Sequence, residues 1–237
     1  MRTTRFDTSE AGSPCRAPRL ASIPDSVRDK VRRTRCGGQR EVVLALGLAG
    51  LVWLIASCVP TAMHPFYRAS DVIYDPALLG VWKDKPDGKE RWSFTPGEGK
   101  SYSLEIQGED YRATFIAHLF KLGDDRFLDI YPAKAGLEEK LDKNPYGLAL
   151  IPTHGFVRVR ATEPALRMSC MGLDWLRQQL KQNPNAIDHV IAPDDRVVFT
   201  AGTEAIQAFI KLHLNNAEAW NDMYDDGLRK VSSPAVK

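Results

Sequence analysis

Apolar and polar side chains alternate along residues 91–107, RWSFTPGEGKSYSLEIQ, on both sides of a glycine-rich break. In the first segment, Trp92 and Phe94 share one side while serine and threonine take the other. In the second, tyrosine, leucine and isoleucine alternate with serine, glutamate and glutamine. A period of two is the pattern of a half-buried antiparallel strand. The stretch therefore predicts two paired strands joined by a turn at Pro96 to Gly99.

The same pattern extends outward in both directions. Turn signals recur about every ten to fifteen residues, which is typical of a series of hairpins. They are Pro86-Asp87-Gly88, Gly108-Glu109-Asp110 and Gly123-Asp124-Asp125. Further strand-like segments are LLGVWK (78–83), RFLDIY (126–131), GFVRVRA (155–161), ALRMSCM (165–171), IDHVI (187–191) and RVVFTA (196–201). We expect a mainly β (α+β) fold, an antiparallel meander or barrel-like sheet of about eight or nine strands.

Two amphipathic helices interrupt the predicted strands. Leu173, Leu176 and Leu180 recur at helical spacing, and Asn183-Pro184 ends that helix. The second begins at Thr203, which we expect to be its N-cap. Its apolar stripe comprises Ile206, Phe209, Ile210, His213, Ala217 and Trp220. Helices with one apolar face usually pack on a sheet, so two packed helices are predicted.

An uncharged apolar run, VVLALGLAGLVWLIA, occupies residues 42–56 and follows a segment rich in arginine. As a helix it would cover about 22 Å, short of the roughly 30 Å of a bilayer core. A basic segment followed by such a run is typical of an export signal. The leader before it is long for a signal peptide, so we expect translation to start downstream of Met1.

The apolar run ends in Ile55-Ala56-Ser57-Cys58, which resembles the lipobox of bacterial lipoproteins. The resemblance implies that Cys58 is lipidated and becomes the new N-terminus. Val59, rather than aspartate, then favours the outer membrane if the cell is Gram-negative. The alternative is an uncleaved transmembrane anchor stretched from Val42 to Met63. Both alternatives place the folded part in the cell envelope, facing the periplasm.

These observations predict four parts of the chain. Residues 1–57 are a signal peptide with an over-extended start, and 58–76 are the lipidated cysteine and a tether. Residues 77–224 form the β-rich globular domain, and 225–237 a flexible tail. Residues 58–237 hold 22 Lys and Arg against 25 Asp and Glu. That balance argues against a nucleic-acid partner, which requires clustered positive charge.

Gly80-Val81-Trp82 resembles the G-x-W that opens the first strand of lipocalins. The resemblance implies a barrel around an apolar ligand, although the helix between late strands departs from that topology. Phe127–Pro132, Leu173–Leu176 and Thr203–Phe209 resemble segments of uncharacterised bacterial lipoproteins, a likeness that brings no known activity. The candidates for ligand contact are Trp82, Trp92, Tyr102 and His154, although an aromatic set of this kind also fills an ordinary core.

No motif for catalysis, nucleotide binding or metal binding is present, and no cofactor is implied. His154 follows Pro152-Thr153 at the start of a strand, where either chemistry or a turn hydrogen bond would explain it. Cys170 shares a strand face with Leu166 and Met168, which predicts a buried thiol. The pairs Asp124-Asp125 and Asp194-Asp195 fall in predicted turns.

We therefore expect a membrane-anchored envelope lipoprotein with a non-catalytic binding domain, for a small apolar ligand. The first alternative is an envelope scaffold or protein-interaction module on an uncleaved anchor. The second is a hydrolase-type enzyme using His154 or Cys170.

Overall fold

The computed structural model describes residues 59–134 and 150–231, and it confirms a mainly β fold with two helices. One mixed sheet holds all twelve strands found in these residues. They are β1 Thr61–Ala62, β2 Gly80–Lys83, β3 Arg91–Pro96, β4 Ser101–Gln107, β5 Arg112–Leu122, β6 Asp125–Pro132, β7 His154–Ala161, β8 Arg167–Met171, β9 His189–Ile191, β10 Val197–Phe199, β11 Trp220–Asp222 and β12 Arg229–Val231. The helices are α4 Leu173–Gln182 and α5 Thr203–His213, with 3-10 turns η2 Ala69–Asp71, η3 Pro76–Leu78 and η5 Ala217–Ala219.

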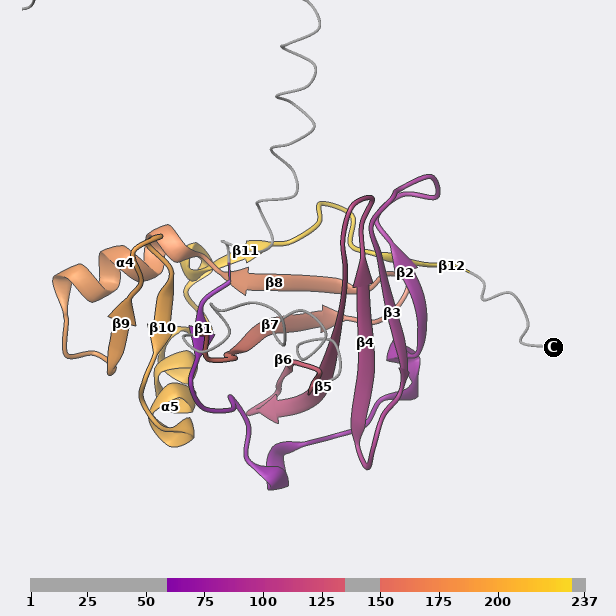
Figure 1. The fold of residues 1–237 in the computed structure, drawn as a ribbon. Coiled ribbons are helices and arrows are strands. Elements are labelled where there is room, and N and C mark those ends of the chain that lie inside the picture. Colours follow the sequence, from indigo (N-terminus) through magenta and orange to yellow (C-terminus); the bar gives the residue numbers. More distant parts are fainter. Residues whose placement is uncertain (1–58, 135–149, 232–237) are drawn as a thin grey trace, which may run out of the picture. The chain divides into compact units, whose positions relative to one another are not determined.

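Strands β2 to β8 form the predicted antiparallel meander, each paired with the next along the chain (Figure 1). In the β3–β4 hairpin Trp92 lies opposite Ile106, and Phe94 lies opposite Leu104. The sheet is not closed into a barrel: it runs from β12 through β2 to β7, then continues through β1 and β10 to β9. The β1–β10 pair is parallel, so the sheet is mixed.

The sheet carries a hydrophobic cluster on each of its two faces. Successive residues of the central strands point to opposite faces, and here both are covered. On β5, Leu119 belongs to one cluster and Phe120 to the other. On β7, Val157 belongs to the same cluster as Leu119, and Phe156 belongs to the same cluster as Phe120. The central parts of strands β5 to β7 are therefore buried on both faces, and a simple polar alternation is absent there.

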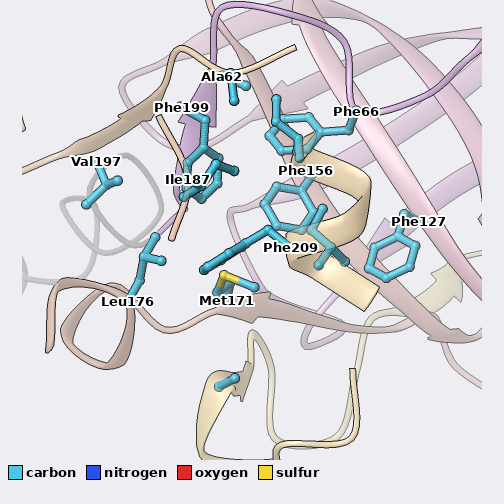
Figure 2. Packing of buried hydrophobic residues seen from close by; sticks show 14 of the residues in the cluster. Ala62, Phe66, Phe127, Phe156, Met171, Leu176, Ile187, Val197, Phe199 and Phe209 are labelled. Carbon is cyan, nitrogen blue, oxygen red and sulfur yellow. The ribbon is translucent and has the colours of Figure 1, made fainter. Parts of the chain in front are cut away.

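The first cluster covers one face of the meander. Its aromatic members are at most 1% exposed and comprise Trp82, Trp92, Phe94 and Tyr102. The second cluster joins α4, α5, β1 and β10 to the opposite face, as Figure 2 shows for part of it. Leu173, Leu176 and Leu180 of α4 are all buried in it, as the leucine spacing predicts.

The prediction that residues 58–76 form a tether is wrong for the described part, residues 59–76. Ala62 and Phe66 are fully buried, and the Phe66 ring lies 4.3 Å from that of Phe156. The buried Gln207 of α5 donates hydrogen bonds to the Phe66 carbonyl and to Asp71. The segment joins the fold through single contacts rather than through a periodic pattern.

The predicted flexible tail also begins too early. Leu228 is 1% exposed, forms a bridge with Leu166, and leads into β12, which pairs with β2.

The N-cap of α5 is Gly202 rather than Thr203, whose hydroxyl instead donates to the Pro65 carbonyl. The apolar stripe continues past the end of α5, because Ala217 lies in η5 and Trp220 in β11.

Cys58 and the predicted signal peptide lie outside the described residues, as do positions 232–237. Within the part of the chain that the structure describes, no helix is long and apolar enough to cross a membrane.

Candidate functional site

Two rows of side chains cross β5, β6 and β7 on the face that also carries the helices. Neighbouring strands hold paired residues side by side. His118 lies opposite Asp129, which lies opposite Phe156. In the next row Ile116 lies opposite Tyr131. His154 is the first residue of β7, which confirms its predicted place at a strand start. The register thus places His118 of β5 and His154 of β7 on either side of Asp129 and Tyr131 of β6.

Asp129 is the centre of this group and is fully buried. Its Oδ2 accepts a hydrogen bond from the Phe66 backbone N–H at 3.0 Å, and its Oδ1 lies 2.8 Å from Nδ1 of His154. A carboxylate can only accept, so Nδ1 of His154 carries the proton. In the neutral ring Nε2 then keeps its lone pair. Within residues 59–134 and 150–231, Nε2 of His154 makes no hydrogen bond.

A second pair, Tyr67 and His118, flanks the carboxylate. The Tyr67 hydroxyl lies 3.1 Å from Nδ1 of His118, and the two rings are 4.7 Å apart. Burial lowers the pKa of His118, and the nearby Asp129 charge opposes this shift. Burial, helped by the Asp129 charge, raises the pKa of Tyr67. Tyr67 therefore stays protonated at neutral pH and donates to a neutral His118.

The outer row is partly open to solvent. The Tyr131 ring lies 4.4 Å from the His154 ring, and the His154 side chain is 13% exposed. Ile116, paired with Tyr131, is 40% exposed. An imidazole held by a buried carboxylate thus stands beside an aromatic ring and an exposed aliphatic side chain. This arrangement offers one directed polar atom within an apolar surface, as small-molecule sites commonly do.

The other three predicted ligand contacts lie elsewhere, in the packed cluster on the opposite face. Trp82 Nε1 donates to the Leu78 carbonyl, and Trp92 Nε1 donates to Glu90. The Tyr102 hydroxyl donates to the Asp75 carbonyl, and burial raises its pKa to about 12. Their polar atoms are used within the fold, so these three are core residues. Of the four candidates only His154 belongs to the polar group.

The remaining acid and thiol candidates are also structural. Asp125 forms an ion pair with the buried Arg158, whose guanidinium also donates to the Leu214 carbonyl at the end of α5. Asp194 pairs with Arg196 in the turn between β9 and β10. Cys170 is buried, as predicted from its strand face. Across the described residues, no three His, Cys, Asp or Glu side chains are placed to hold a metal ion together.

Sequence reasoning found His154 but missed Asp129, His118 and Tyr67. A signal for Asp129 was present: it is the single charge in the apolar run Phe127–Tyr131. A charge there must be paired if both strand faces are buried. Its partner could not be read from the sequence, because the contact depends on the register between β6 and β7.

Comparison of the chain with models of protein families, with curated proteins and with solved structures gives no match. The candidate site therefore rests on the geometry of this chain.

Proposed function

We propose that this chain is a lipid-anchored protein of the bacterial cell envelope whose β domain binds a small, partly apolar molecule at His154. The anchor is Cys58, supported by the lipobox-like Ile55-Ala56-Ser57-Cys58 after an apolar run. More than one acyl chain on that cysteine would hold the protein stably in a membrane. The domain then works at the envelope, facing the periplasm.

The observation that carries the binding proposal is the hydrogen bond between buried Asp129 and Nδ1 of His154. It fixes the ring orientation, and in the neutral ring it also fixes the tautomer, so that Nε2 is an acceptor of fixed direction. Tyr131 and the exposed Ile116 supply apolar surface beside it. The ligand class that fits is a small molecule with an apolar body and a hydroxyl or N–H group that donates to Nε2.

Native mass spectrometry of the mature protein, purified in mild detergent from its own host, tests this proposal. We expect a small-molecule adduct on the wild type that is lost in His154→Ala. The matched control is His189→Ala, because the His189 ring of the edge strand β9 donates to the nearby backbone carbonyl of Ile187. An adduct kept in His154→Ala, or none on the wild type, would contradict the proposal and favour the scaffold alternative.

A second candidate, a hydrolase-type enzyme, is favoured by the same Asp129–His154 contact. A histidine oriented through Nδ1 by a buried carboxylate is a common general base, with Nε2 taking a proton from water or a nucleophile. Assays with ester and phosphoester substrates test this candidate. Turnover that is lost in His154→Ala and kept in Cys170→Ser would support it, whereas binding without turnover would leave the first proposal standing.

A further inference from the structure

We infer that the β9 edge of the sheet, at Val190 and Ile191, lies against the membrane surface that holds Cys58. The inference rests on the proposed lipid anchor and adds which part of the domain meets the bilayer.

The first step is the short connection between anchor and fold. Val59 packs beside Gly155 of β7, Pro60 is buried, and β1 begins at Thr61. Three residues span at most about 10 Å even when fully extended. A lipid on Cys58 would therefore place β1 close to the headgroup region, with no tether to hold the domain away.

The second step is the position of β9 relative to β1. Thr61 pairs with Val198 of β10, and Val198 pairs with Val190 of β9. Neighbouring strands lie about 4.8 Å apart, so Val190 is roughly 10 Å from Thr61. Because β1 and β10 are parallel, the β9–β10 turn lies at the end of the sheet where β1 begins. Ile191 is the last residue of β9 before that turn.

The third step is the contrast between the two edges of the sheet. At one edge β12 carries Arg229 and Lys230, charges of the kind that keep an open edge from pairing with other chains. At the other edge β9 is His-Val-Ile, and Val190 and Ile191 are 52% and 55% exposed. An open edge with exposed apolar side chains is available for pairing or burial, and the nearest large apolar phase to it would be the bilayer anchored at Cys58.

The test uses the full-length protein, processed in cells and reconstituted into phosphatidylethanolamine–phosphatidylglycerol vesicles that contain doxyl-labelled lipid. A bimane probe is attached to Ile191→Cys, with Thr95→Cys as the matched control. Thr95 is exposed on β3, far along the strand order from β9. The unsubstituted protein serves as the control for background labelling of the buried Cys170. We expect doxyl lipid to quench the fluorescence of the probe at position 191 and to leave that of the probe at position 95 unquenched.

Three outcomes would overturn the inference. The first is a vesicle-bound protein whose probe at position 191 is no more quenched than the probe at 95. The second is rapid formation of a disulfide dimer by unlabelled Ile191→Cys in the vesicles, which would assign this edge to a second copy of the chain. The third is a protein that washes off the vesicles, which would refute the lipid anchor itself and so is distinguishable from the first two.

Discussion

Asp129 is a carboxylate with no contact with solvent, and its two oxygens are satisfied by two different parts of the chain. One accepts from the backbone of Phe66, and the other from the imidazole of His154. Burying a charge without partners is costly, so these bonds are a condition of the fold as well as of the site. Asp129 thereby links the segment that precedes β2 to the first residue of β7.

Replacing Asp129 by asparagine should lower the free energy of unfolding by about 2 kcal/mol, because a charged acceptor is exchanged for a neutral one beside two donors. Urea denaturation measures this change. The control is Asp124→Asn, at an exposed position in the turn between β5 and β6, where we expect a change within about 0.5 kcal/mol. Equal effects of the two substitutions would show that the Asp129 contacts do not hold the fold.

His118 makes stability depend on pH. Burial lowers its pKa in the folded state below the ordinary value of 6.5. Below pH 6.5 the unfolded chain therefore binds more protons than the folded protein, and stability falls as the pH falls. His118→Asn keeps an acceptor near the Tyr67 hydroxyl but does not titrate. Unfolding measured at pH 7.5 and 5.5 should show a smaller loss in this variant, and an unchanged loss would refute the assignment.

His154 was predictable and its environment was not. Proline and threonine before a strand-like segment place His154 at the start of β7. Its partner Asp129 lies 25 residues earlier, and only the register of two strands brings them together. The sequence does not separate His154 from Trp82, Trp92 and Tyr102, because an aromatic residue gives the same sequence pattern in a packed core and at a ligand site.

At the scale of elements, the clearest link is between α5 and the segment from Phe66 to Asp71. Gln207 is 2% exposed, donates to the Phe66 carbonyl at 3.0 Å and to Asp71 at 2.8 Å, and accepts from Arg68. This one side chain therefore fixes the course of the chain that covers Asp129 and His118.

Gln207→Ala should lower the free energy of unfolding by about 2 kcal/mol, because it leaves buried polar groups without partners. It should also weaken ligand binding at His154, since Phe66 and Tyr67 are then less firmly placed. The control is Glu204→Ala on the same helix, whose ion pair with Arg68 is exposed and worth little. Chemical denaturation of both variants measures the difference, and similar values for the two would contradict this role.

Elements with one buried face were predictable. Strands β3 and β4 and helix α4 follow their apolar spacing. The longest strand, β5, lacks a clean alternation because residues such as Leu119 and Phe120 are buried on opposite faces. The sequence wrongly predicts a tether around Phe66 and a tail around Leu228, since a single buried side chain in a polar stretch produces no period.

At the scale of the whole described domain, two hydrophobic clusters share the strands β5 to β7. One cluster holds Leu104 and the other holds Ile206, and both side chains are fully buried. Because the central strands belong to both clusters, loss of either should disrupt the other. The lipocalin-like expectation of one barrel around a cavity does not describe this open, two-sided sheet.

Leu104→Ala and Ile206→Ala should therefore each shift one common unfolding transition, by about 3 kcal/mol. Circular dichroism and tryptophan fluorescence, followed together in denaturant, should give coincident curves for both variants. Two separate transitions, each moved by only one of the substitutions, would show that the clusters unfold independently.

The proposed function depends most on the lipid anchor at Cys58, and labelling of cells with radioactive palmitate tests that anchor. We predict that the wild-type protein takes up the label and that Cys58→Ala does not, while the unlabelled precursor accumulates with its leader attached. Label retained in Cys58→Ala, or a wild-type protein found in the cytosol without label, would contradict the claim that this domain works at the envelope membrane.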